Sequence, residues 1–115
     1  MPRDPSLYLD EILEAITQIR EYTLSMSYED FTRDRKTQDA VVRNLEIIGE
    51  AAGRLPEAMK DRTREIEWRK IAGLRNILAH EYFGVSLPVV WDVVQNKLDA
   101  IATACKRLVE DEKPG

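Results

Sequence analysis

Apolar residues recur at steps of three and four along nearly the whole chain, which is the spacing of amphipathic helices. The first stripe consists of Leu9, Ile12, Leu13, Ile16, Ile19, Thr23 and Met26. Asp4 or Ser6 is placed to cap this helix, and Pro5 suits its first turn. The polar stretch 27–37 then predicts a connection, in which we expect Phe31 to enter the core.

A second stripe follows and ends before Pro56. It consists of Val41, Leu45, Ile48, Ala52 and Leu55. Its segment 49–53, GEAAG, has small side chains that let another helix approach closely. Glycine within a helix costs about 1 kcal/mol relative to alanine, so we expect a packing reason for Gly49. Residues 56–64 predict a short helical turn or an irregular connector.

Two further helices are predicted in the C-terminal half. One begins near Glu67 or Trp68 and ends around 82–84, because Gly84 is a natural helix terminator. The last helix is capped by Ser86 and tolerates Pro88 in its first turn. Its stripe consists of Leu87, Val90, Trp91, Val94, Leu98, Ile101, Cys105 and Leu108.

These stripes predict an all-α protein. Helices joined by short links bury their apolar faces most simply as an antiparallel bundle. We therefore expect one domain, residues 1–115, with four main helices and a short connecting helix. Trp68, Trp91 and the motif-side aromatics provide more apolar surface than one small core needs, and a homodimer is expected.

Composition narrows the function classes. Hydrophobic residues make up 43% and charged residues 33% of the chain, a balance typical of globular proteins. No apolar run approaches the length of a membrane span, and the N-terminus lacks the apolar block of a signal peptide, so the expected location is cytoplasmic. One cysteine, Cys105, and one histidine, His80, exclude an internal disulfide and a zinc constellation; no metal or cofactor is expected.

Charge is unevenly distributed along the chain. The net charge of −4 argues against a protein that binds nucleic acid in bulk. Residues 4–30 contain seven acids and one base, whereas residues 60–75 contain six bases and three acids. The second segment could steer an anionic ligand, or it could be a solvated helical face with internal ion pairs.

The basic segment leads into RNILAHEYFGV, residues 75–85, which contains Arg75, His80 and Tyr82. Histidine can exchange a proton near neutral pH, and arginine has a fork of donors that fits phosphate oxygens. A tyrosine hydroxyl can donate a hydrogen bond or accept a transferred group. The three would suit chemistry on a phosphodiester, but they would equally suit an ordinary helix end, where histidine caps carbonyl groups.

Helix geometry limits how these side chains can meet. Arg75 and Tyr82 share one face, and Asn76 and His80 share another, whereas Arg75 and His80 lie about 140° apart around the axis. They converge only if the helix ends or unwinds near His80, or if a second subunit completes the cleft. From the residues alone, both the functional and the structural interpretation stay open.

The pattern R-x4-H-x-Y, from Arg75 to Tyr82, resembles the signature of the HEPN superfamily, and most closely its HepT branch of toxins. Three further segments carry the resemblance: LEIIGEAAGRLP at 45–56, EWRKIAGLRNILAHEYFGV at 67–85, and VVWDVV at 89–94. The resemblance implies a dimeric helical bundle in which the two motifs face a shared cleft. It further implies a metal-independent endoribonuclease with Arg75 and His80 as catalytic residues.

The resemblance also implies a partner. HepT toxins are neutralised by an MntA-like nucleotidyltransferase antitoxin that transfers AMP to the motif tyrosine, here Tyr82. Asn76 fits the family's preference for a polar residue after the arginine, and we expect it to orient His80 from one helical turn away. Glu50 has two interpretations, a supporting role at the cleft or simple pairing with Arg54.

Two other functions stay open. The chain could be a non-catalytic helical partner or substrate-binding subunit of a minimal nucleotidyltransferase, or a purely structural bundle. Which RNA would be cleaved cannot be deduced from the sequence, although Tyr82 or Phe83 beside basic residues would suit single-stranded RNA.

Overall fold

The computed structural model describes residues 4–80 and 87–112, and all regular secondary structure in these two ranges is helical. The helices are α1 Pro5–Tyr22, α2 Tyr28–Thr32, α3 Arg35–Gly53, α4 Glu57–Asp61, α5 Trp68–His80, α6 Leu87–Asn96 and α7 Leu98–Glu112. The predicted all-α class is confirmed, and α4 is the predicted short connecting helix. The expected terminator Gly84 and cap Ser86 lie outside the described residues.

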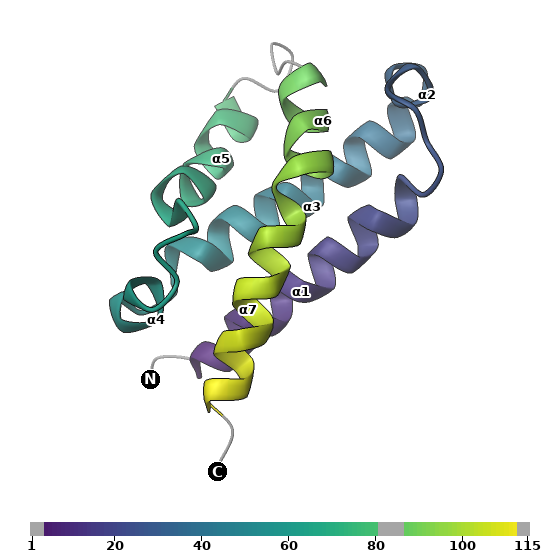
Figure 1. The fold of residues 1–115 in the computed structure, drawn as a ribbon. Coiled ribbons are helices and arrows are strands. Elements are labelled where there is room, and N and C mark those ends of the chain that lie inside the picture. Colours follow the sequence, from purple (N-terminus) through teal and green to yellow (C-terminus); the bar gives the residue numbers. More distant parts are fainter. Residues whose placement is uncertain (1–3, 81–86, 113–115) are drawn as a thin grey trace.

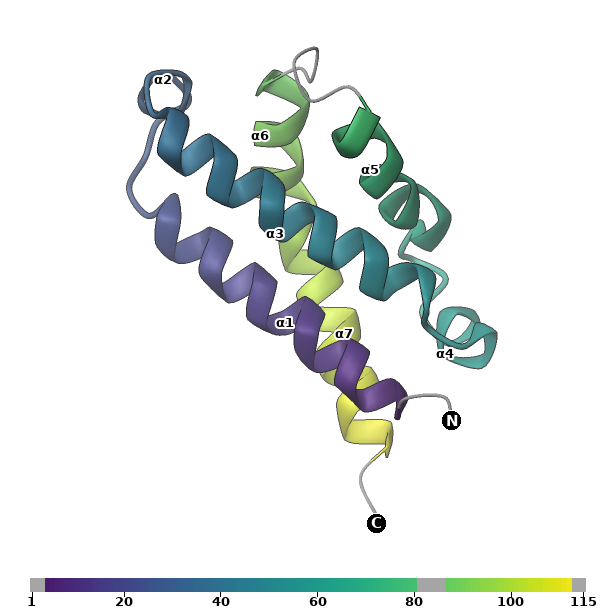
Figure 2. The ribbon, with the colours of Figure 1, turned by 180° about the vertical axis from the view of Figure 1, so that it is seen from behind.

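The helices form two layers. α1 and α3 lie side by side and antiparallel in one layer, which faces the viewer in Figure 2. The other layer consists of α5 and the α6–α7 pair, which pass over the opposite side of α1 and α3 (Figure 1). α3 packs extensively against both α1 and α5, and α7 packs against α1. α3 is therefore the central helix, because it packs against α1 within its own layer and against α5 of the other layer.

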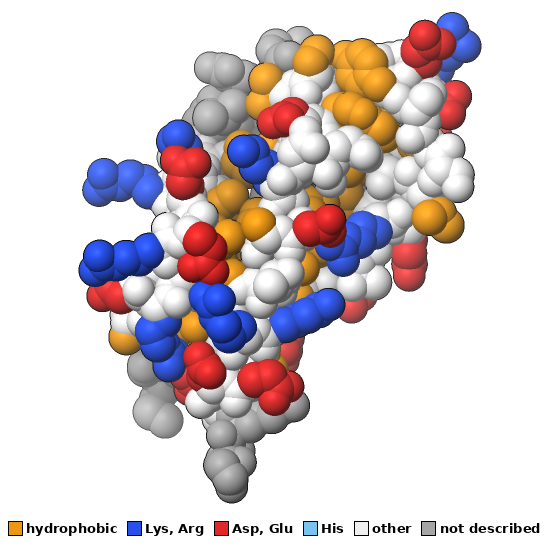
Figure 3. Space-filling model, viewed as in Figure 1, with side chains coloured by type: hydrophobic (Ala, Val, Ile, Leu, Met, Phe, Trp, Pro, Cys, Tyr) orange, Lys and Arg blue, Asp and Glu red, His pale blue; other side chains and the backbone are white. Residues whose placement is uncertain are grey.

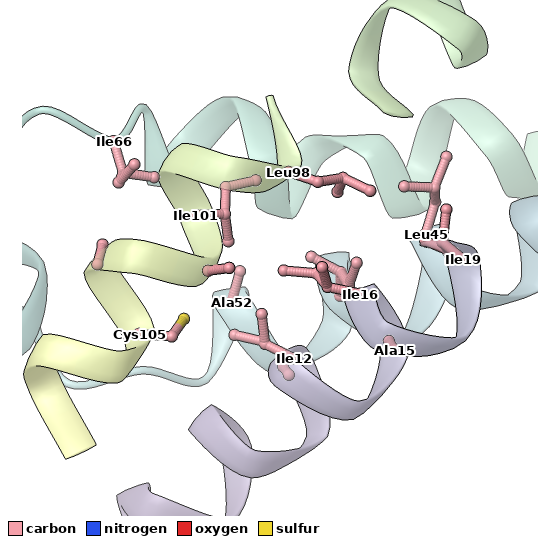
Figure 4. Packing of buried hydrophobic residues seen from close by; sticks show 14 of the residues in the cluster. Ile12, Ala15, Ile16, Ile19, Leu45, Ala52, Ile66, Leu98, Ile101 and Cys105 are labelled. Carbon is pink, nitrogen blue, oxygen red and sulfur yellow. The ribbon is translucent and has the colours of Figure 1, made fainter. Parts of the chain in front are cut away.

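One hydrophobic core fills the space between the layers. Figure 4 shows side chains of α1, α3 and α7 pointing into it, among them Ile12, Ile16, Leu45, Leu98 and Ile101. Each of these five is at most 2% exposed. They belong to the apolar stripes predicted from the sequence, so the helical periodicity is sufficient to identify most of this core.

The helix starts follow from capping chemistry. The Asp4 carboxylate accepts a bond from the Ser6 N–H at 3.0 Å, which selects Asp4 over Ser6 as the cap of α1. Asp34 likewise accepts from the Thr37 N–H at 3.0 Å, so α3 begins inside the stretch expected to be a connection. That stretch also contains α2, whose Phe31 is fully buried as predicted.

The last predicted helix is divided in two. α6 ends at Asn96 and α7 begins at Leu98, with Lys97 between them. Backbone bonds continue across the break: the Lys97 N–H donates to the Val93 carbonyl at 3.0 Å, and the Ile101 N–H donates to the Lys97 carbonyl at 3.3 Å. The division is therefore a local distortion of one long helical segment, not a loop.

The start of α5 is held by a buried hydrogen bond. The Trp68 indole N–H donates to the Thr63 hydroxyl at 2.9 Å, and that hydroxyl donates to the Met59 carbonyl at 2.8 Å. Nearby, Arg107 of α7 donates to the Arg62 carbonyl at 3.1 Å and to the Glu65 carboxylate at 2.8 Å. These bonds connect the α4–α5 linker to the core and to α7, and so orient α5.

Replacing Thr63 with valine tests this anchor. Thr63→Val keeps the shape of the side chain but leaves the buried Trp68 N–H without its acceptor, which costs about 1–3 kcal/mol of unfolding free energy. Chemical denaturation followed by circular dichroism measures the loss. Thr103→Val, on the exposed side of α7, is the matched control and leaves the stability nearly unchanged. Equal stabilities of the two variants would show that the Trp68–Thr63 bond does not anchor α5.

Candidate functional site

Helix α5 contains most of the motif that the sequence singles out. Arg75, Asn76 and His80 all lie in its C-terminal half, and Asn76 is exposed. The predicted acceptor Tyr82 lies outside the described residues. The roles assigned to Arg75, His80, Tyr82 and Asn76 thus stay predictions, now with a backbone position for three of them.

The helical backbone is continuous from Arg75 to His80. The two residues are therefore separated by about 7.5 Å along the axis and about 140° around it, as in any regular α-helix. Unwinding before His80 does not occur in the described part of α5, whereas a helix end directly after His80 would fall outside the described residues and stays a prediction for how the two side chains meet. Completion of the site by a second subunit is the other way, and the helix geometry is consistent with it.

The position of α5 depends on small side chains in α3. A Cβ atom placed on Gly53 would lie 3.7 Å from the Cβ of Ala72 in α5, so the two backbones are in close contact. Gly49, one turn earlier in α3, is buried. The segment GEAAG thus lies where two main helices pack closely, as its composition predicts.

Glu50 faces away from most of these contacts. Its carboxylate lies 3.6 Å from the guanidinium of Arg54, one turn later, and both side chains are more than half exposed. Both residues also line a groove between α3 and α1. The Glu50–Arg54 pair that the sequence suggested is therefore present, and a supporting role for Glu50 at the motif stays a prediction.

The basic segment before the motif is partly neutralised. Lys60 lies 3.8 Å from Glu57, Arg62 lies 3.3 Å from Glu112, and Lys70 lies 2.7 Å from Glu67. Arg64 and Arg69 are exposed and form no ion pair with any residue of 4–80 or 87–112. Ion pairs are therefore present at three of the six bases, and the steering of an anionic ligand by the others stays a prediction.

A small groove of about 340 Å³ runs along α5, between it and the α6–α7 pair. Ile71, Leu74 and Val93 contribute to its apolar lining. At its edge, the Lys70 ammonium lowers the pKa of the Glu67 carboxyl from its usual value, first by a hydrogen bond and then by charge. Asn96 and Lys97 also line the groove, and no sequence pattern identified them, since they lie on the last helix outside any motif.

An apolar surface occupies the end of the molecule where the described part of α5 ends. Val89 of α6 is 57% exposed and Tyr28 of α2 is 37% exposed. Figure 3 shows hydrophobic side chains gathered at this end, over α2 and the start of α6. Between them, Trp91 packs on Phe31 with ring centroids 5.1 Å apart, and Tyr28 lies 6.2 Å from Trp91. Trp68, by contrast, is only 5% exposed and belongs to the core of its own chain.

The described part of the chain contains no reactive thiol, no cluster of metal ligands and no membrane-spanning helix. Burial raises the pKa of the Cys105 thiol to about 12, so it is not a nucleophile at neutral pH. Residues 4–80 and 87–112 contain no group of three or more His, Cys, Asp or Glu side chains placed to hold a metal ion. None of the described helices is both long and apolar enough to cross a membrane.

Comparison with known proteins identifies relatives along nearly the entire chain. The family model "Ribonuclease HepT-like" matches residues 12–108. A Thermococcus cleftensis protein named "Probable ribonuclease HepT" is 43% identical over 108 residues, which are 94% of this chain and 98% of that protein. A Methanocaldococcus jannaschii protein named "Putative RNase MJ0127" is 38% identical over 112 residues, 96% of this chain and 93% of its own length. Among solved structures, none gives a significant match.

Proposed function

Since the chain belongs to the HepT-like ribonuclease family, we propose that it is a metal-independent endoribonuclease and the toxin of a toxin–antitoxin module. The observation that carries the proposal is the position of Arg75 and His80 on one continuous helix, α5, inside the segment that matches the family. Two relatives are named as ribonucleases, which supports the same activity for this chain.

The reaction would use the 2′-hydroxyl of RNA as its nucleophile. His80 takes the proton of that hydroxyl, whose oxygen bonds to the adjacent phosphorus while the bond to the 5′-oxygen breaks. Arg75 neutralises the phosphoryl oxygens as negative charge develops on them. The products are a 2′,3′-cyclic phosphate and a 5′-hydroxyl, and DNA is not a substrate because it lacks the 2′-hydroxyl.

A homodimer would complete this site. The leaving 5′-oxygen needs a proton, and each chain contains only one histidine. In a dimer whose motifs face a shared cleft, one His80 acts as base and the other as acid. The exposed surface formed by Tyr28, Val89 and Trp91 lies at the motif end of the molecule and supports pairing there.

The antitoxin in this proposal is an MntA-like nucleotidyltransferase. The Tyr82 hydroxyl attacks the α-phosphorus of ATP, a new oxygen–phosphorus bond forms, and pyrophosphate leaves as the hydroxyl loses its proton. The adenylate adds bulk and negative charge two residues from His80. Like charge then repels the RNA backbone, which explains why the modification would neutralise the toxin.

Cleavage of single-stranded RNA in excess EDTA tests the activity. The purified, partner-free protein is expected to cleave, whereas His80→Ala and Arg75→Ala lower the rate by about 100-fold or more. Arg43→Ala, an exposed arginine of α3 outside the motif and the basic segment, is the matched control and retains the native rate. Asn76→Ala and Glu50→Gln show whether either residue supports the site.

Two results would contradict the activity: cleavage that requires a divalent ion, and cleavage that persists in both catalytic variants. If the native chain is inactive, its intact mass shows whether Tyr82 is already adenylylated. An unmodified and inactive chain would favour the non-catalytic partner of a nucleotidyltransferase.

The dimer is tested by sedimentation at micromolar concentration. Val89→Lys places a charge in the proposed interface and is expected to weaken dimerisation by about tenfold or more. Leu7→Lys is the matched control, because Leu7 is 43% exposed near the opposite end of the molecule. A monomeric native chain would argue against a shared cleft, and equal effects of both variants would place the interface elsewhere.

Modification is tested by incubating the chain with ATP and an MntA-like nucleotidyltransferase from the same genome. Intact mass spectrometry is expected to show added adenylyl groups together with loss of RNA cleavage. Tyr82→Phe removes the acceptor and abolishes both changes, while Tyr22→Phe, an exposed tyrosine in α1, leaves them intact. Adenylylation that persists in Tyr82→Phe would assign the acceptor to another residue.

A further inference from the structure

A second groove, larger than the one along α5, lies on the outer side of α1 and α3, in the layer that does not contain the motif. Its volume is about 840 Å³, and its lining residues come from these two helices and from Arg54, the C-cap of α3. In Figure 2 the α1–α3 pair faces the viewer, and no other described helix lies over it. Along α1 the groove extends from Leu7 to Gln18, which corresponds to about 16 Å, or three helical turns.

Part of the lining of the groove is apolar. Leu7, Ala15, Ile47 and Ala51 contribute to it, and Leu7 is 43% exposed. Ala15 and Ala51 are almost fully buried, whereas the exposed apolar atoms of Leu7 and Ile47 would lose contact with water if a helix covered them. This is the surface that an amphipathic helix recognises through side chains spaced three and four residues apart.

The edges of the groove are strongly acidic. Asp10 and Glu14 of α1 line it, and the one base among its lining residues, Arg54, already lies 3.6 Å from Glu50 of α3. The one base of α1, Arg20, is also occupied, because it pairs with Asp99 of α7. The groove therefore presents an excess of negative charge to its occupant.

We propose that the groove between α1 and α3 binds a positively charged amphipathic helix of a partner protein different from this chain. The apolar face of that helix would cover Leu7 and Ile47, and its lysines or arginines would pair with Asp10 and Glu14. Charge complementarity favours a partner helix of positive charge and raises its rate of association with the groove.

Charge also argues against a second copy as the occupant. A two-fold contact through this face would place the acids of one α1 opposite those of the other, and like charges across an interface are unfavourable. Seating the basic α4–α5 region of another copy in the groove would be a head-to-tail contact, which extends to an open chain of molecules unless it closes into a ring.

The test uses a defined probe. It is a stapled helical peptide of about 15 residues with leucines on one face and lysines on the other, because shorter peptides are marginal helices in water. The control peptide has the same leucines with glutamates in place of the lysines. Binding to the full chain is measured by fluorescence anisotropy, and amide chemical shifts locate the contact.

We expect saturable binding of the lysine peptide, with shifts in α1 and α3, and no binding of the glutamate peptide. The double variant Asp10→Lys, Glu14→Lys raises the dissociation constant by about tenfold or more. Its matched control, Glu29→Lys with Asp61→Lys, makes the same change of charge and leaves binding within about twofold, because neither residue lines the groove and salt screens exposed charges outside it.

Three outcomes would overturn the proposal: no saturable binding, equal binding of both peptides, and equal effects of the two double variants. A change of oligomeric state in the Asp10→Lys, Glu14→Lys variant alone would assign the face to self-association and overturn it as well. None of these measurements depends on RNA cleavage, so the result is independent of the proposed activity.

Discussion

The close packing of α5 on α3 determines where the motif of this protein lies. Gly53 approaches Ala72 so closely that a Cβ atom on the glycine would be in van der Waals contact with it. Larger side chains at this crossing would move α5 outward and with it Arg75 and His80, which lie further along the same helix. An alanine at Gly53 would still fit in ordinary contact with Ala72, so the close approach of the two helices limits the side chain at this position to a small one.

The same crossing leaves the two sides of α3 with different roles. One side contacts α5, and the other faces α1 and contributes Glu50 and Arg54 to the outer groove. The candidate nuclease motif and the proposed docking groove are therefore on different layers of the bundle. A partner helix could occupy the groove while the motif end stays accessible to RNA or to a second copy.

Much of the fold follows from local rules. The apolar stripes of α1, α3 and α7 identify the core, and Asp4, Pro5 and Pro88 have the positions that capping and first-turn preferences assign to them. Local rules are weaker where two choices have similar energies. Asp34 caps α3 inside a stretch that is polar enough to be a connection. The helix distortion at Lys97 could not be predicted from the sequence, because no proline or glycine lies at that position. Trp68 was expected to add to exposed apolar surface, but its indole lies in the core because Thr63 supplies an acceptor five residues away.

The sequence by itself determined the helical class, the family and the identity of the residues proposed for catalysis, because periodicity and a short motif depend only on the order of residues. Tertiary structure alone decided that Glu50 lines the α1–α3 groove beside Arg54, that Asn96 and Lys97 lie along α5, and that Tyr28 meets Trp91. Most of these contacts join residues that are far apart in the chain, so their spacing in the sequence does not predict them. Their geometry depends on how whole helices pack, and helix packing is set by the sum of many weak contacts that no single segment contains.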